Sequence, residues 1–234
     1  MRTSAIYAVA AWGSLVFVAL TIGAMWVYPG GTFVDHASTG YDFLRNFFSD
    51  TGMTAAHNGL PNPVGRMLFT VATTVAGTGL VLFFAAFPEF FTRTPTSRRL
   101  AIAGTAFGIV AGVCFVGIAF TPADRLLDIH IQFVLWAFRT FPLAAFLFAA
   151  AIVVTGDYPR RYAAAFLGFG VLLVSYILLL EFGPSIRTPA GLLIQATGQK
   201  VIVYASIIVV MIQAIGARRE AARRQASVQL QPET

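Results

Sequence analysis

Residues 128–154 read DIHIQFVLWAFRTFPLAAFLFAAAIVV, a run that is apolar along most of its length. An α-helix rises about 1.5 Å per residue, so about 20 such residues cross the roughly 30 Å hydrocarbon core of a bilayer. The run therefore predicts a transmembrane helix. Five further runs of similar length and composition occur, at residues 4–28, 63–87, 99–120, 162–182 and 189–216.

The composition of the whole chain agrees with these runs. Of its 234 residues, 57% are hydrophobic and only 11% are charged, and the mean hydropathy is +0.75. A soluble domain of this size could not cover so much apolar surface with polar side chains. We therefore expect an all-α polytopic membrane protein with six transmembrane helices in one bundle.

The distribution of arginine predicts the orientation, because basic residues near span ends favour the cytoplasmic side. With a cytoplasmic N-terminus, ten arginines fall in cytoplasmic segments and four in outer segments. The ten are Arg2, Arg93, Arg98, Arg99, Arg160, Arg161, Arg218, Arg219, Arg223 and Arg224, and the four are Arg45, Arg66, Arg125 and Arg187. The pattern predicts a plasma-membrane protein with both termini in the cytoplasm.

The chain divides into one membrane domain and a tail. Residues 1–216 are joined by mostly short loops, which suit antiparallel neighbouring helices. Residues 217–234 are basic and then polar, which is typical of a frayed helical end followed by a disordered cytoplasmic tail. The net charge of +6 is split among short loops and this tail, so it reflects topology and predicts no nucleic-acid binding. Membrane lipids are the expected partners, and no cofactor is predicted.

A ridge of small residues marks the third span, where Gly104, Gly108 and Gly112 recur every four residues. Such a ridge lets another helix approach closely. Packing against a helix of the same chain is the simpler interpretation, and a homo-oligomer contact is the alternative.

The long connection at residues 29–62 carries a helical pattern. Five polar residues would share one face of an α-helix, and apolar residues would occupy the other. The polar set is Asp42, Arg45, Asn46, Ser49 and Asp50, and the apolar set is Phe43, Leu44, Phe47 and Phe48. We expect an extracytoplasmic amphipathic helix that lies on the membrane surface, covers the outer mouth of the bundle, or does both.

Two cations fall within predicted spans, where a charge costs at least about 2.5–3.5 kcal/mol. Arg139 and Lys200, the only lysine, each lie about eleven residues into a span, roughly 15–18 Å below the outer surface. Neither has a carboxylate at its own depth. Each therefore needs a long reach to Glu181, water, backbone carbonyls or an anionic ligand such as a lipid phosphate, unless it only fixes packing or extends to the interface.

Other polar residues line the same spans. Asp128 and Gln132 share a helical stripe with Arg139, and His130 points elsewhere. Gln195 and Gln199 precede Lys200 in the sixth span, and Glu181 closes the fifth. Whether these groups converge on one site does not follow from the sequence.

The segment from Tyr41 to Asn62, YDFLRNFFSDTGMTAAHNGLPN, carries an N-x-x-S-D-x-G pattern at Asn46, Ser49, Asp50 and Gly52. It resembles the bacterial and archaeal membrane proteins grouped as domain of unknown function 998. The resemblance extends to Asn62 and to the Asp128 and His130 start of the fourth span, although Thr51 replaces the usual leucine. It implies a six-helix bundle and singles out the outer loop, but it implies no particular activity.

These observations favour an outward-facing polar intramembrane site for an anionic lipid or another amphiphile. The predicted site comprises Arg45, Asn46, Ser49, Asp50, Asp128, His130, Gln132, Arg139, Glu181, Gln195, Gln199 and Lys200. One alternative is a membrane-embedded metal-dependent hydrolase using Asp50, His57 and His130, although no known motif supports it. A second is a structural or accessory subunit whose polar residues secure packing. The sequence does not decide among enzyme, transporter and accessory subunit.

Overall fold

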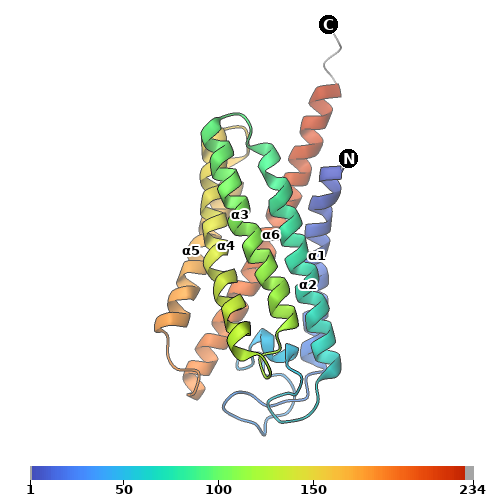
Figure 1. Ribbon diagram of the computed structural model, residues 1–234, viewed down its shortest axis with the longest axis vertical. Helices are drawn as coiled ribbons and strands as arrows, with labels where there is room; N and C mark the ends of the chain where they lie inside the picture. Colours follow the sequence, from blue (N-terminus) through green and yellow to red (C-terminus); the bar gives the residue numbers. More distant parts are fainter. Residues whose placement is uncertain (1, 230–234) are drawn as a thin grey trace.

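A computed structural model describes residues 2–229 of the chain. Six helices in this range are long and apolar enough to cross a membrane, which confirms the expected six-span, all-α architecture (Figure 1). They are α1 (Arg2–Trp26), α2 (Pro63–Ala86), α3 (Pro95–Phe120), α4 (Leu127–Thr155), α5 (Arg160–Phe182) and α6 (Pro189–Gln229). Two short 3-10 helices, η1 (Phe48–Gly52) and η2 (Phe87–Phe90), flank α2.

Local sequence signals set several helix ends. Proline opens α2, α3 and α6, where its missing N–H costs no hydrogen bond and its fixed φ suits a first helical turn. The Thr94 hydroxyl caps α3 by accepting from the backbone N–H of Ser97 at 3.1 Å. Gly156 ends α4 with a φ of 71°, a left-handed conformation that glycine adopts without strain.

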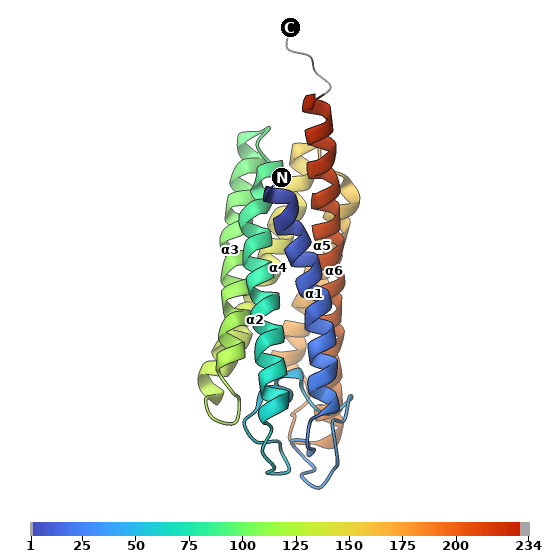
Figure 2. The same ribbon diagram turned by 90° about the vertical axis from the view of Figure 1, so that its right-hand side faces the viewer.

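The helices form a closed ring in chain order. Each helix packs against the next, and α6 returns to pack against α1. The start of α1 and the end of α6 lie at one end of the bundle, and the connection between α1 and α2 lies at the other (Figures 1 and 2). Short loops and an even number of spans produce this arrangement.

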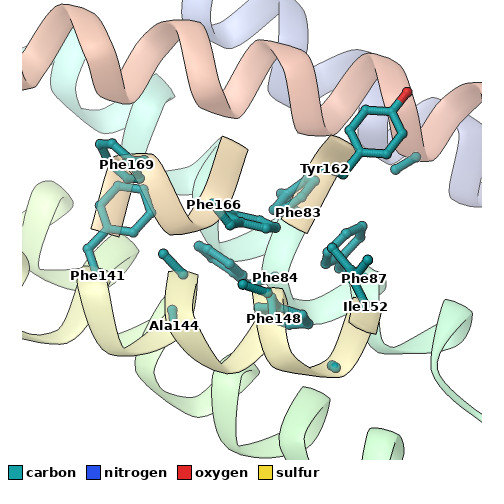
Figure 3. Close-up of a cluster of buried hydrophobic side chains, with 14 of the residues drawn as sticks. Phe83, Phe84, Phe87, Phe141, Ala144, Phe148, Ile152, Tyr162, Phe166 and Phe169 are labelled. Atoms are coloured by element: carbon teal, nitrogen blue, oxygen red, sulfur yellow. The ribbon is translucent and has the colours of Figure 1, made fainter. Parts of the chain in front are cut away.

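Phenylalanine fills the bundle half that is nearer the chain ends. Phe83 and Phe84 of α2 and Phe87 of η2 meet Phe148 of α4 and Phe166 of α5 (Figure 3). The Phe84 and Phe148 rings stack with centroids 5.5 Å apart, and Phe87 and Phe148 lie 4.9 Å apart. Large, rigid rings fill the space between helices without adding polar atoms. This half of the bundle is therefore a packed aromatic core.

The predicted glycine ridge lies against helices of the same chain. A Cβ on Gly104 would meet the Phe148 ring of α4, and one on Gly108 would meet the Phe84 ring of α2. Gly112 faces the Gly77 carbonyl oxygen of α2, which would lie 2.9 Å from such a Cβ. A homo-oligomer contact through this ridge would have to displace α2 and α4.

Helix α6 continues well beyond the membrane span. The sequence predicted a frayed helical end from Ala217 followed by disorder, and the structure is helical through Gln229; residues 230–234 of the predicted tail lie outside the described residues. Glu220 accepts hydrogen bonds from Arg223 and Arg224 at 3.0 and 3.2 Å, which are i,i+3 and i,i+4 pairs that stabilise a helix. Packing of Ala217 and Ala221 into the core adds a tertiary contribution that the tail composition did not reveal.

Candidate functional site

The connection between α1 and α2, residues 27–62, folds back on the end of the bundle, and we call it the outer loop. Isolated bridges pair Gly30 with Thr39 and Ala55 with Pro61. Gly31 has a φ of +82°, and a Cβ there would lie 2.4 Å from the backbone nitrogen of Asn58. Only glycine allows the two halves of the loop to approach so closely.

The prediction of an amphipathic helix over residues 42–50 is wrong for most of that segment. Residues 43–46 form turns, and only Phe48–Gly52 are helical, as the 3-10 helix η1. The Asp42 carboxylate accepts from the backbone N–H groups of Leu44 and Arg45, at 2.9 and 3.1 Å. The Asn46 side-chain oxygen accepts from the Asp42 N–H at 2.9 Å. Short polar side chains thus bind the backbone groups that a continuous helix would have used.

Asn46 and Asp50 lie at the buried centre of the outer loop. The Asn46 amide donates to the Gly31 carbonyl and to the Asp50 carboxylate, both at 2.9 Å. The same Asp50 oxygen accepts from the Phe47 N–H at 3.0 Å and lies 3.4 Å from His57 Nε2. The two residues of the N-x-x-S-D-x-G pattern that point inward therefore hold the loop together.

Lys200 joins this loop to α6. Its ammonium donates to the carbonyl oxygens of Asn46 and Ala196 and is only 2% exposed. The rings of Tyr41, Phe43 and Phe48 surround it with centroids 5.4–5.8 Å from Nζ, a geometry suited to cation–π attraction. Among the described residues, Lys200 has no ion-pair partner.

We call Asn46, Asp50, His57, Gln199 and Lys200 the outer cluster. Gln199 completes it by accepting from the backbone N–H of Phe48 at 2.7 Å. Four of its members belong to the predicted site, and His57 was predicted only for the hydrolase. Residues separated by about 150 positions meet here, so no local pattern could have shown the contact.

Tyrosines of the outer loop also contribute, although the sequence did not single them out. The Tyr41 hydroxyl donates to the Asn46 and Phe47 carbonyls, each at 3.1 Å. Burial raises the pKa of Tyr41 well above its usual value, so the hydroxyl remains a donor at neutral pH. The Tyr28 hydroxyl accepts from the His57 backbone N–H at 3.1 Å. The aromatic character of Tyr28 and Tyr41 was the only available sequence signal.

Asp124, in the α3–α4 connection, anchors the second half of the outer loop. Its carboxylate accepts from the Thr54 hydroxyl and from the backbone N–H groups of Thr54 and Ala55. Burial alone would raise the pKa of Asp124, but these hydrogen bonds outweigh it and hold the pKa below its usual value. Asn62, at the start of α2, adds bonds from its amide to the carbonyls of Thr51 and Met53.

Arg139 lies apart from the outer cluster. Its Nη2 donates to Glu181 Oε1 at 2.7 Å, with 50% and 43% of the two side chains exposed on the surface of the bundle. The long reach to Glu181, one of the options open from sequence, neutralises this cation, whereas backbone carbonyls hold Lys200. The two predicted intramembrane cations therefore do not converge.

Exchanging the charges of the Arg139–Glu181 pair tests its role. Glu181→Gln leaves an unpaired guanidinium within a span and should lower stability by on the order of 2–3 kcal/mol. Combining Arg139→Glu with Glu181→Arg should restore most of that loss, and thermal unfolding of the purified protein in lipid nanodiscs measures both. An unstable exchanged pair beside a stable Glu181→Gln variant would contradict the assignment.

The remaining predicted residues are dispersed. His130 Nδ1 lies 2.6 Å from the Thr121 carbonyl, and the Gln195 amide donates to carbonyls of Leu179 and Pro184 near the end of α5. Arg45 pairs with Asp42 at 2.9 Å. Asp128 and Gln132 are exposed on α4, and Ser49 is half-buried. The structure thus brings together only part of the predicted set.

The described residues contain no group of three or more histidine, cysteine or acidic side chains that could hold a metal. Asp50 and His57 of the alternative hydrolase set are in contact, but His130 is bonded to the Thr121 carbonyl. The structure thus joins two of these three residues.

An apolar cavity lies deeper in the bundle than the outer cluster. It lies among α1, α2, α3, α4 and α6 and has a volume of about 60 Å³, and we call it the central cavity. Its two serines, Ser14 and Ser206, donate to the Ala10 and Ile202 carbonyls of their own helices, at 3.0 and 2.7 Å. The wall therefore offers hydrocarbon contacts and no free hydroxyl donor.

The central cavity and the outer cluster share a boundary. Phe17 lines the cavity, and its ring lies 6.3 Å from that of Phe48 in the outer loop. Val203, one helical turn beyond Lys200, also lines the cavity and packs against the group of buried residues that includes Phe48. Phe48 thus separates a buried cation from an apolar space.

Comparisons of the chain with protein-family models, with curated proteins and with solved structures found no match. The fold, the outer cluster and the central cavity together define a class, namely a six-span membrane protein with a polar cluster over an apolar cavity.

Proposed function

We propose that the protein binds an anionic lipid or a related single-chain amphiphile, with its tail in the central cavity and its head at the outer cluster. The observation that carries the proposal is the apolar central cavity beside the buried ammonium of Lys200.

The chemistry of the wall selects the kind of ligand. The cavity wall consists of apolar side chains and of two serines whose hydroxyls already donate to carbonyls of their own helices. Such a wall favours a hydrocarbon tail, because a polar group there would lose its hydrogen bonds to water. An anionic head would replace the Asn46 carbonyl at Lys200 and would supply the counter-ion that this ammonium lacks among its described contacts. Arg139 takes no part, because Glu181 already neutralises it.

The location of the protein is part of the same proposal. We place both termini in the cytoplasm and the outer loop outside the plasma membrane, because arginines concentrate at the end of the bundle that carries the termini. The ligand would then enter from the outer leaflet. The resemblance to domain of unknown function 998 is consistent with this arrangement and adds no substrate.

Filling the central cavity tests the proposal. Ala76 lines the cavity, so Ala76→Phe should exclude the tail and abolish a lipid-sized bound mass in native mass spectrometry of gently extracted protein. Ala164→Phe is the matched control, because Ala164 is exposed on α5 and its larger side chain would face outward. Palmitate added in excess serves as a defined probe if the native ligand is lost during extraction.

A second variant tests the head position. Lys200→Met should retain neutral lipids but lose the preference for anionic species, including palmitate. If Ala76→Phe keeps the full bound mass, or if the unmodified protein binds neither native lipid nor palmitate, the proposal fails. The latter result would favour a structural or accessory role.

The contact between Asp50 and His57 supports a hydrolase as the second candidate, since a histidine beside a carboxylate can act as a general base. His57→Ala separates the two candidates. It should abolish hydrolysis of a bound ester if the protein is a hydrolase, and it should leave palmitate binding unchanged if the protein only binds lipid.

A further inference from the structure

The end of the bundle that carries both termini holds a second groove, between α1 and α6. It has a volume of about 380 Å³ and is lined by Ala8, Ala11 and Trp12 of α1 and by Ile215, Arg218 and Arg219 of α6. Figure 2 shows the two helices side by side along this face. The groove is distinct from the central cavity and from the outer cluster.

Two arginines provide its charge. Arg218 and Arg219 have no ion pair among the described residues. By contrast, Arg223 and Arg224 both pair with Glu220, and these three residues line a different depression beside Phe90. The carboxylate nearest along α6 is therefore engaged elsewhere.

A second carboxylate, Glu89, lies behind the groove. Glu89 of η2 accepts a hydrogen bond from the hydroxyl of Tyr7, a groove-lining residue, at 2.9 Å. Tyr7 itself is fully buried and forms the floor of the groove. Glu89 keeps its charge but does not line the groove, so Arg218 and Arg219 are the charged residues of its lining.

The apolar wall extends from these arginines toward the membrane interior. Trp12 is 66% exposed and Ile215 is 40% exposed, and small alanines between them leave room for a chain. The lining residues of α6 run from Ala214 to Ala222, about 12 Å along the helix axis. This order of charge and then apolar surface matches the order of headgroup phosphate and acyl chain in a phospholipid.

We propose that this groove binds an anionic phospholipid, with its phosphate at Arg218 and Arg219 and an acyl chain along Trp12 and Ile215. Guanidinium groups bind phosphate oxygens through paired, charge-assisted hydrogen bonds. An anionic leaflet also attracts basic residues that lie near its surface. The proposal is independent of the amphiphile site at the other end of the bundle.

Trp12 supplies a local probe of the groove. Replacing Trp26 and Trp136, which are both exposed, by phenylalanine leaves Trp12 as the single tryptophan. The full chain is then placed in phosphatidylcholine vesicles that contain a small fraction of either brominated phosphatidylglycerol or brominated phosphatidylcholine. Bromine quenches tryptophan on contact, so stronger quenching by the phosphatidylglycerol is expected.

Arginine variants test the specificity. Arg218→Gln and Arg219→Gln should each lower the preference for phosphatidylglycerol about fivefold. The double variant Arg98→Gln with Arg99→Gln, at the same end of the bundle on α3, should leave it unchanged. Equal quenching by the two lipids, or the same loss in the α3 control, would overturn the proposal; circular dichroism checks that every variant remains helical.

Discussion

Leucine in place of Gly112 is expected to lower the free energy of unfolding by about 3 kcal/mol, at the upper end of the usual cost of overpacking. A Cβ at this position would lie 2.9 Å from the Gly77 carbonyl oxygen and 3.0 Å from the Val81 nitrogen. Both neighbours are backbone atoms of α2, which cannot turn aside as a side chain can. The substitution must therefore push α2 away from α3.

Thermal unfolding in nanodiscs, followed by circular dichroism, measures this effect. Gly168→Leu is the matched control, because Gly168 is also helical and has no atom within 4 Å of a built Cβ. That control should be neutral or slightly stabilising, since glycine is a poor helix former. A Gly112→Leu variant as stable as the Gly168→Leu control would show that α2 and α3 do not pack as described.

The second large effect is expected at the centre of the outer loop, where Asn46→Ala should cost about 3–4 kcal/mol of local stability. Asn46 is fully buried, and the change removes its bonds to the Asp42 N–H, the Gly31 carbonyl and the Asp50 carboxylate. These three groups would be left without a hydrogen-bond partner unless water reached them. The loop should therefore open while the six spans remain folded.

Trypsin cleavage at Arg45 in oriented vesicles reports this opening, because Arg45 lies in the outer loop beside Asn46. Asn46→Ala should be cut much faster than the unmodified protein, with unchanged helical circular dichroism. Asn58→Ala is the control, since its main contact is a single exposed bond to the Leu60 N–H at 3.1 Å. Equal cleavage of the two variants would contradict the central role of Asn46.

The two proposed lipid sites differ in the rearrangement that ligand binding requires. The outer site combines an apolar cavity with a buried cation that is bonded to the loop. Ligand binding there requires Phe48, which lies between them, to move aside and the Lys200 contact with Asn46 to exchange. The groove between α1 and α6 has free arginines and an open apolar wall, and it requires no such rearrangement. The experiments on Ala76 and on Arg218 therefore test separate sites.

The sequence by itself determined the six-span bundle. The free energy of placing about 20 apolar residues in lipid is a sum over neighbouring residues, so length and composition were enough to locate every span. The same local information identified Arg139 and Lys200 as unusual, because a charge within a span needs a partner. Asn46 and Asp50 were singled out by the polar pattern of the outer loop.

Only the tertiary structure decided which partners these residues have. Lys200 meets Asn46 across about 150 residues, and Arg139 meets Glu181 on a neighbouring helix instead of joining Lys200. Helical periodicity failed in the outer loop because Asp42 and Asn46 bind its backbone through their side chains. The central cavity likewise arises from the packing of five helices, and no single helix contains the information that would place it.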